Sequence, residues 1–208
     1  MEEPEAQVET EGELRRLHEG GDLEGAATLA LRRYGPELLG FLAAAGRGAV
    51  DVDEVFGAFS EALWRSLPRF RWQSSFRTWA YAVARHTLLQ AHRRARVVAR
   101  RQGGAVSRLE AVAIDVRTTT APYLRTSVKD DLGRLRAELD DDEQALLILR
   151  IDRHLAWLEI ARIMADPADA SIEEAAELRR RAAALRKRFE RLKERLSALI
   201  KAGRASSG

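Results

Sequence analysis

Apolar residues recur at steps of three and four along most of the chain, the spacing that places side chains on one face of an α-helix. No segment shows a convincing two-residue alternation typical of a half-buried strand. The clearest case is residues 51–67, where the apolar positions are Val52, Val55, Phe56, Phe59, Leu63 and Leu67. The predicted fold class is therefore all-α.

Helix-breaking and helix-capping residues divide the first half of this pattern. Gly35-Pro36 predicts a stop, with proline suited to opening the next helix. Pro68 ends a later helix because the residue before a proline resists helical geometry, and residues 69–73 are then expected to form a loop. Ser74 or Ser75 is expected to cap the helix after it. The predicted helices cover residues 22–34, 37–45, 51–67 and about 75–101.

The middle of the chain has a different character. Residues 103–129 have no sustained period and contain GG, TTT and a proline, which is typical of a linker. Beyond it, the pattern predicts helices over 127–138, 141–151 and 154–165. A capping-box spacing at residues 171–174 then predicts the start of a long last helix that reaches about residue 201.

These boundaries predict two small helical domains joined by a flexible linker. In chain order, we expect an acidic N-terminal tail at 1–19, a helical domain at 20–101, the linker at 102–126, a second helical domain at 127–201 and a flexible tail at 202–208.

The second domain has the outline of a helix-turn-helix with an elongated last helix. A helix at 154–165 is followed by a turn and then by the basic stretch LRRRAAALRKRFERLKERL. Nine basic residues fall between Arg179 and Arg195 against two acids, Glu190 and Glu194. Such a helix would gain affinity for DNA from phosphate neutralisation. An antiparallel helical hairpin or a coiled-coil segment is the alternative, since an apolar stripe also runs along these residues.

Composition excludes several classes of protein. The 208 residues are 46% hydrophobic and 32% charged, which is typical of a globular chain. The chain has no cysteine, so disulfides, zinc-thiolate sites and a cysteine nucleophile are excluded. The start, MEEPEAQVETEGE, lacks the apolar core of a secretory signal. No run approaches the roughly 18 apolar residues of a membrane span, and we expect a cytoplasmic protein without a membrane partner.

The net charge of +3 conceals a strong segregation of charge. Residues 1–61 carry 14 acids and 5 bases, whereas residues 62–109 carry 11 arginines and no acid. Residues 110–208 hold 19 bases and 18 acids. An acid-free stretch of this length indicates a surface that faces a polyanion, and nucleic acid is favoured over simple solvation.

Within the acid-free stretch, RFRWQSSFRTWAYAVARH (residues 69–86) interleaves five aromatic residues with four arginines. Aromatic faces can stack on unpaired bases, and fixed cations can follow the phosphate backbone. This segment is part of the surface that we expect to face a polyanion, with nucleic acid as the favoured partner.

No catalytic or metal-binding constellation is recognisable. The four histidines have no spacing with a carboxylate that would form a metal-binding face, and there is no phosphate-binding loop or nucleophile elbow. Asp140, Asp141, Asp142 and Glu143 stand at a helix start, where acids complement the helix dipole. We predict a protein that is not an enzyme and has no cofactor or metal.

Four segments resemble bacterial RNA polymerase sigma factors in their order and spacing. They are DLEGAATLALRRYGPELLGFL, DVDEVFGAFSEALWRSLPRFR, SSFRTWAYAVARHTLLQAHRRAR and LDDDEQALLILRIDRHLAWLEIARIM. The resemblance is to the extracytoplasmic-function (ECF) group, which keeps regions two and four, and it covers roughly residues 20–101 and 127–201. It implies a transcription initiation factor that directs core polymerase to specific promoters.

The resemblance also implies which residues bind the minus-ten element, where sigma region two separates the strands and captures flipped bases. The loop at 69–74 occupies the base-holding position, Trp79 matches a wedge position beside the melted fork, and many relatives have Asn at the position of His86. The candidates are Arg69, Phe70, Arg71, Trp72, Ser74, Arg77, Trp79, Tyr81, Arg85, His86, Gln90, Arg93 and Arg94. Arg77, Tyr81, Arg85, His86 and Gln90 are expected on the face opposite the buried stripe.

The resemblance also implies the partners of the protein. Region two docks on the clamp helices of the largest polymerase subunit, with Asp53, Glu54, Glu61 and Trp64 as candidates. Relatives often carry Gln-Glu where this chain has Gly57-Ala58, which indicates close backbone packing or a variant docking surface. The other expected partners are the β-subunit flap and promoter DNA. Whether an anti-sigma protein also binds is left open by the sequence.

Region four is implied to read the minus-thirty-five element. Some dozen extra residues precede the part of the last helix that is in register with relatives. Two groups of basic residues are therefore alternative candidates to enter the DNA groove. The candidates are Arg179, Arg180, Arg181, Arg186, Lys187, Arg188 and Arg191.

Two other functions stay open from the residues alone. A stand-alone helix-turn-helix regulator would bind duplex DNA without stimulating polymerase. A helical interaction protein with a basic face for RNA or ribosomes would show little sequence preference and would leave the aromatic loop without a role.

Overall fold

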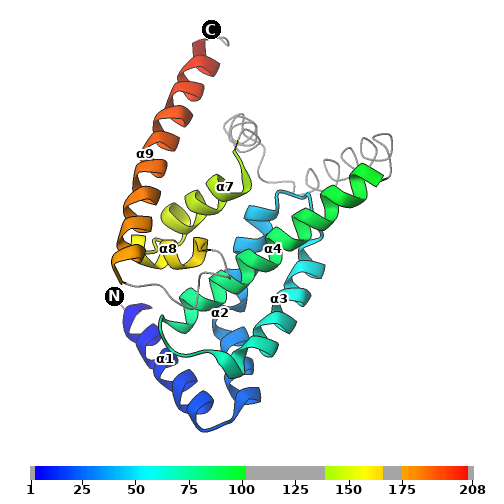
Figure 1. The fold of residues 1–208 in the computed structure, drawn as a ribbon, viewed down its shortest axis with the longest axis vertical. Helices are drawn as coiled ribbons and strands as arrows, with labels where there is room; N and C mark the ends of the chain where they lie inside the picture. Colours follow the sequence, from blue (N-terminus) through cyan, green and yellow to red (C-terminus); the bar gives the residue numbers. More distant parts are fainter. Residues whose placement is uncertain (1–2, 102–138, 166–174, 206–208) are drawn as a thin grey trace. The chain divides into compact units, whose positions relative to one another are not determined.

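The computed structural model describes residues 3–101, 139–165 and 175–205, which are shown in colour in Figure 1. Their regular elements are all helical, so the predicted all-α class is confirmed. The chain divides into two compact units, Met1–Ala95 and Arg96–Gly208, which are described separately below. Across the described residues, no helix is both long enough and apolar enough to cross a membrane.

The first unit begins with a helix where an acidic tail was expected. Helix α1 (Glu3–Glu19) turns back onto α2 (Leu23–Gly46) through Gly20 and Gly21, and Gly21 has a φ of 81°. Leu14 of α1 is fully buried. The tail prediction was wrong because one apolar side chain, together with polar contacts to distant residues, is enough to dock a mostly acidic segment.

Helix α2 is continuous, so the predicted break at Gly35-Pro36 is also wrong. A proline inside a helix removes one backbone hydrogen bond and costs about 3 kcal/mol in an isolated helix. Here Tyr34, Gly35 and Leu38 are buried on the packed face, while the Pro36 ring points to solvent. A Cβ on Gly35 would stand 3.7 Å from Phe56, an ordinary van der Waals distance, so this buried position of the helix has room for a small side chain. Tertiary packing thus overrides the local stop signal.

The remaining helices of this unit agree well with the sequence pattern. Asp51 caps α3 (Val52–Ser66), whose Val55, Phe59 and Leu63 are buried. A 3-10 turn at Leu67–Arg69 follows, so Arg69 belongs to this turn and not to the predicted loop. The cap of α4 (Phe76–Arg101) is Ser75, because its hydroxyl accepts a hydrogen bond from the Thr78 amide at 3.1 Å.

The second unit contains α7 (Asp141–Leu147), a π-helical turn (Ile148–Asp152), α8 (Trp157–Met164) and α9 (Ala175–Ala205). Helix α8 begins three residues later than predicted, after His154, which has a φ of 53°. Helix α9 runs on to Ala205, so residues 202–205 of the expected flexible tail are helical. The predicted linker, the helix at 127–138 and the capping box at 171–174 lie outside the described residues.

Helices α8 and α9 pack through an apolar seam. Ala161, Leu178 and Ala182 are buried there, with Trp157 and Leu185 against them. The Trp157 and Phe189 rings meet edge to face at 5.5 Å. The apolar stripe predicted on the last helix therefore faces α8. The helix-turn-helix itself stays a prediction, because its turn lies outside the described residues.

Candidate nucleic-acid interface

Four aromatic rings gather where the segment between α3 and α4 enters α4. Phe70 is central: its ring stacks on Trp79 at a centroid distance of 4.6 Å and lies 4.8 Å from Trp72 and 5.6 Å from Phe76. Phe70 is buried, whereas Trp72 and Trp79 are half-buried. Trp72 and Trp79 are thus the rings of this cluster that keep part of their surface exposed.

Trp72 holds an unusual backbone conformation. Its φ of 56° lies in the left-handed region, which costs a residue with a side chain about 1–2 kcal/mol. Two residues of α1 contact its ring: the indole Nε1 donates to His18 Nδ1 at 3.3 Å, and the Arg15 guanidinium lies 5.8 Å from the ring centroid. The conformation of this loop therefore depends on a helix more than 50 residues away in the sequence.

The same helix caps the start of α4. One carboxylate oxygen of Glu11 accepts from the Phe76 amide at 2.7 Å, and the other accepts from the Arg77 amide at 3.0 Å. Both amides lie in the first turn of α4, where backbone N–H groups have no acceptor within the helix and negative charge is favourable. Tyr34 also donates to Glu11 at 3.1 Å, and burial, reinforced by the Glu11 charge, raises the pKa of the Tyr34 hydroxyl.

The faces of α4 differ from the prediction. Tyr81 is fully buried and meets Phe41 of α2 edge to face at 5.3 Å, so its expected outward position is wrong. Arg85 is only 8% exposed, and Arg77 makes a bidentate ion pair with Glu37 at 2.9 and 3.0 Å. Arg77 and Tyr81 are not free to face outward because Glu37 and Phe41 of α2 contact them. Tyr81 and Arg85 are therefore not carried into the proposed interface.

The other minus-ten candidates remain accessible to different degrees. Arg69, Arg71, Gln90, Arg93 and Arg94 are exposed, and Ser74 and His86 are half-buried. The Gln90 amide and the His86 Nε2 are hydrogen-bonded at 2.6 Å, so these two side chains present one joint surface. The structure thus brings a ring cluster and a row of exposed cations together on α4 and the loop before it.

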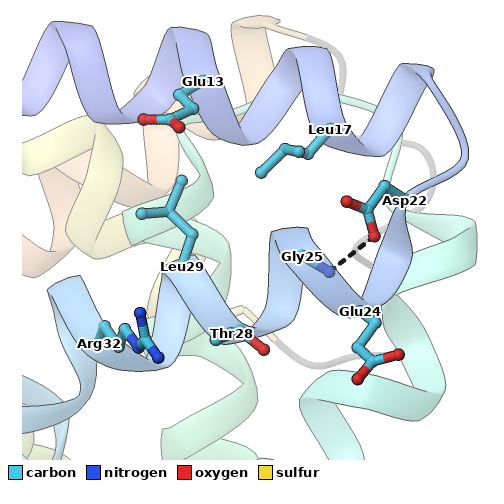
Figure 2. Close-up of a pocket in the computed structure, with 8 residues that line it drawn as sticks. All are labelled: Glu13, Leu17, Asp22, Glu24, Gly25, Thr28, Leu29 and Arg32. Carbon is cyan, nitrogen blue, oxygen red and sulfur yellow. Dashed lines mark hydrogen bonds between the residues drawn. The ribbon is translucent and has the colours of Figure 1, made fainter.

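A groove of about 400 Å³ lies between α1 and α2, and none of the four rings is among its lining residues (Figure 2). Three acids line it, Glu13, Asp22 and Glu24, and the Asp22 carboxylate caps α2 by accepting from the Gly25 amide at 2.8 Å. Arg32 is the basic residue of its lining. This balance of charge disfavours a polyanion, so the groove is not part of the candidate interface.

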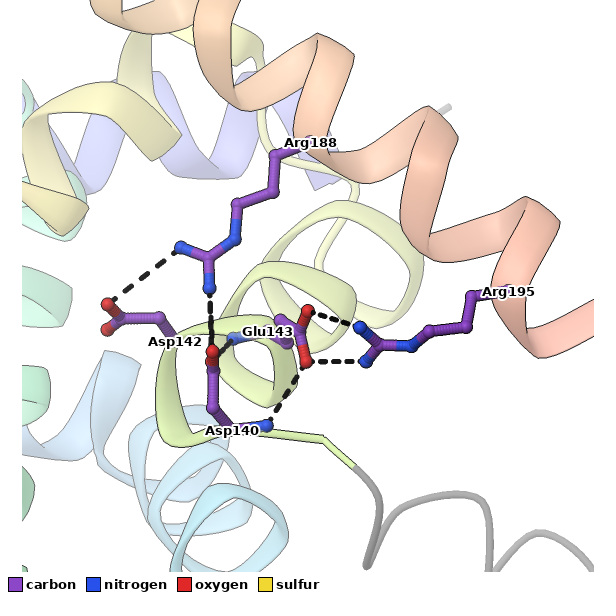
Figure 3. A network of polar contacts seen from close by, with 5 residues as sticks. All are labelled: Asp140, Asp142, Glu143, Arg188 and Arg195. Carbon is purple, nitrogen blue, oxygen red and sulfur yellow. Dashed lines mark hydrogen bonds and ion pairs between the residues drawn. The ribbon is translucent and has the colours of Figure 1, made fainter.

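In the second unit, acids of α7 bind two arginines of α9 (Figure 3). Arg188 donates to both oxygens of Asp140, at 3.1 and 2.9 Å, and lies 3.9 Å from Asp142. Arg195 forms a bidentate pair with Glu143 at 3.0 and 2.7 Å. Hydrogen bonding from Arg195 is the main reason that the pKa of Glu143 lies below its ordinary value. These arginines hold α9 against α7.

The predicted minus-thirty-five residues therefore separate into two groups. Arg180 and Arg181 pair with Glu177 within α9, and Arg188 pairs with α7. Arg179, Arg186, Lys187 and Arg191 are exposed, and none has an ion pair within the described residues. The second group is the better placed to meet a phosphate backbone.

Asp140 and Glu143 have the structural role that the sequence predicts. The Asp140 carboxylate accepts from the Glu143 amide, and the Glu143 carboxylate accepts from the Asp140 amide, which is a complete capping box at the start of α7. Within the part of the chain that the structure describes, no group of three histidine or acidic side chains could hold a metal ion.

Comparison with known proteins identifies the first unit. Residues 30–97 match the family described as Sigma-70 region 2. These residues, which run from α2 through α3 into α4, are similar to sigma-70 region 2, and we refer to them as region 2. Over 107 residues the chain is 35% identical to the RNA polymerase sigma factor YlaC of Bacillus subtilis, a match that covers 51% of this chain and 60% of that relative. No solved structure matches significantly. The resemblance to sigma factors predicted from the sequence is thereby confirmed.

The α3 surface of region 2 carries the residues predicted to bind core polymerase. Asp53, Glu54, Glu61 and Trp64 are all exposed, and Trp64 is 48% exposed. Glu61 pairs with Arg65 one turn along the helix. A Cβ on Gly57 would have no neighbour within 4 Å, so the close backbone packing offered as one reason for this glycine is wrong. Gly57 and Ala58 instead leave a shallow, uncharged part of an exposed helix face.

Sequence reasoning missed the residues of α1 that contact region 2, namely Glu11, Arg15 and His18. All three precede the matched residues 30–97. The available signal was weak: Leu14 and Leu17 stand at a three-residue step, and Gly20-Gly21 follows as a helix stop. Nothing local in the sequence indicates that Glu11 caps a helix 65 residues later.

Proposed function

We propose that this protein is a transcription initiation factor of the ECF group of sigma factors. It binds core RNA polymerase and directs it to specific promoters, with region 2 opening the minus-ten element and a region four at 127–201 reading the minus-thirty-five element. Catalysis belongs to the polymerase, and work with this partner implies the bacterial cytoplasm. The observation that carries the proposal is the ring cluster at the start of the acid-free helix of region 2.

Strand opening needs surfaces on which unstacked bases can rest, and each base–ring stack is worth about 1–3 kcal/mol. Trp72 and Trp79 offer half-buried rings, and Arg69 and Arg71 flank them as exposed cations. Arg93 and Arg94 extend the cationic row further along α4. This combination supports the capture of one separated strand beside a duplex.

The exposed α3 surface supports docking on the polymerase. Trp64 is a large exposed ring among acids, and such aromatic residues commonly anchor protein interfaces. We place the clamp helices of the largest subunit against Asp53, Glu54, Glu61 and Trp64. The β-subunit flap is the partner proposed for region four, and an anti-sigma protein would compete for the same surfaces.

Exposure favours Arg179, Arg186, Lys187 and Arg191 as the phosphate-contacting residues of region four. They carry no competing acid within the described residues, whereas Arg180, Arg181 and Arg188 do. Neutralising phosphates with unpaired cations avoids the cost of breaking an existing ion pair.

Transcription with purified core polymerase on fragmented genomic DNA, with and without the protein, tests the proposal. New RNA starts that share two upstream motifs would establish an initiation factor and give both elements at once. If folded protein and active core yield no new starts, the stand-alone helix-turn-helix regulator becomes the better account. It would then bind duplex sites without stimulating core.

A further inference from the structure

We propose that His18 of α1 is a positioning residue for the minus-ten loop, acting through the Trp72 ring. The inference rests on the proposed function, and it extends the interface to a helix that lies before the matched residues 30–97. His18 touches no base itself in this account; it sets the conformation of the residue that does.

The two ring nitrogens of His18 have opposite hydrogen-bond roles. The Trp72 indole nitrogen can only donate, so His18 Nδ1, 3.3 Å away, accepts. His18 Nε2 lies 2.9 Å from the Leu67 carbonyl oxygen, which can only accept. The ring is thus held between the first residue of the 3-10 turn and Trp72 in the loop that follows it.

Ring contacts add to these two bonds. The His18 ring meets Trp72 edge to face at 5.9 Å and Phe70 at 6.3 Å. It thereby touches both the buried ring at the centre of the cluster and the half-buried ring at its edge. No other side chain among the described residues accepts the Trp72 indole N–H.

Trp72 requires such support because its φ of 56° is unfavourable for a residue with a side chain. Without His18, the backbone can relax and carry the ring away from Phe70 and Trp79. The platform offered to an unstacked base would then be lost, while the exposed cations further along α4, Arg93 and Arg94, would stay where they are. Loss of His18 should therefore impair strand opening more than duplex binding.

The free protein provides the first test. In the full chain labelled with indole ¹⁵N-tryptophan, the Trp72 resonance is assigned by its absence in Trp72→Phe. His18→Ala should move this resonance more than those of Trp64 or Trp157, whereas His18→Gln should largely restore it, since an amide can also donate and accept. Arg16→Ala is the matched control, because its exposed side chain makes no ion pair or side-chain hydrogen bond within the described residues. An unmoved Trp72 resonance in His18→Ala overturns the positioning role.

The second test uses holoenzyme on a promoter mapped by the transcription experiment. We expect His18→Ala to reduce permanganate-detected opening about tenfold, which corresponds to the loss of one base–ring stack. The affinity of the closed complex should be the same for His18→Ala and Arg16→Ala. His18→Gln should recover most of the opening. Equal losses in opening and in closed-complex affinity overturn the inference. If wild-type protein opens no promoter with active core, the proposed function fails, and the indole resonance still decides whether His18 positions Trp72.

Discussion

Glu11 shows how a single side chain can join three helices. Its carboxylate accepts from the Phe76 and Arg77 amides of α4 and from the Tyr34 hydroxyl of α2. Hydrogen bonds to a charged group contribute more to stability than neutral ones, and removal of the acceptor leaves part-buried donors unsatisfied. The acidic segment before region 2 is thus a structural part of the unit.

We predict that Glu11→Ala lowers the free energy of unfolding of the first unit by about 2 kcal/mol, and Glu11→Gln by about half as much, since the amide keeps one acceptor oxygen. Urea unfolding of the full chain measures this, because Trp64, Trp72 and Trp79 report on the first unit. Glu13→Ala is the control on an exposed position of the same helix. Equal stabilities of Glu11→Ala and Glu13→Ala would show that the cap is dispensable.

Trp72 permits a second test at the scale of the residue. Trp72→Gly and Trp72→Ala both lose the ring, but only glycine adopts a φ of 56° without a steric cost. We expect Trp72→Gly to be about 1 kcal/mol more stable than Trp72→Ala in urea unfolding, although glycine is the more flexible residue in the unfolded chain. The opposite order would mean that the loop relaxes once the ring is gone.

At the scale of the element, α7 is held to α9 by charge. Arg195 lowers the pKa of Glu143 from its ordinary value of 4.5, so the folded state favours the carboxylate. A lowered folded pKa adds stability that is fully present above the unfolded value and is lost as pH falls through the folded value. The contact between α7 and α9 should therefore weaken in acid.

We predict that wild-type protein loses more stability than Glu143→Gln in the second unit as the pH falls below 4.5, the ordinary pKa of a glutamate. At neutral pH, Glu143→Gln should itself cost about 1 kcal/mol, because Arg195 is half-exposed and the pair is partly screened. The Trp157 indole resonance, followed through urea unfolding, reports on this unit. Parallel pH profiles for the two proteins would show that the pair contributes nothing to stability.

The two neighbours Lys187 and Arg188 should separate binding from folding. Lys187 is exposed, whereas Arg188 is bound to Asp140 and Asp142. Lys187→Ala is expected to weaken holoenzyme binding to duplexes with a minus-thirty-five element and to reduce the salt slope by about 1, with stability unchanged. Arg188→Ala is expected to lower the stability of the second unit, with a smaller effect on the salt slope.

These two variants are each other's control. The affinity and its salt dependence are measured by fluorescence anisotropy, and the stability by urea unfolding. If Arg188→Ala reduces the salt slope more than Lys187→Ala does, the paired arginine leaves α7 to bind DNA, and the assignment of the two groups is reversed.

At the scale of the whole molecule, charge is sorted along the chain. Residues 62–109 contain no acid, and among their exposed arginines are Arg93 and Arg94 of α4. Each phosphate neutralised on a duplex contributes about −0.9 to the slope of log affinity against log salt. The net charge of +3 therefore says less about DNA binding than the position of the cations does.

The double variant Arg93→Ala/Arg94→Ala should reduce the salt slope of promoter binding by about 2 units, without changing the sequences of the promoters selected. Closed-complex affinity measured over a range of salt concentrations checks this, and mapped RNA starts check the selection. An unchanged slope would place the duplex on another face of region 2.

The sequence by itself determined the helical class, most helix positions and the resemblance to sigma factors. Periodicity suffices for α3 and α4, because each has a strong apolar stripe and a local cap, Asp51 and Ser75. The same holds for α7, whose capping box lies within four residues. The nature of the candidate interface also followed from the sequence, since an acid-free row of arginines and rings needs no tertiary information to indicate a polyanion.

Only the tertiary structure decided which of these residues are available and what holds them. Whether Tyr81 faces solvent depends on α2, and whether Arg188 is unpaired depends on α7, about 45 residues earlier in the chain. Pro36 lies inside a helix because packing around Tyr34 and Leu38 outweighs a local stop. Glu11 and His18 act on residues more than 45 positions away. Local sequence rules describe neighbours in the chain, and these contacts join segments that are distant until the chain folds.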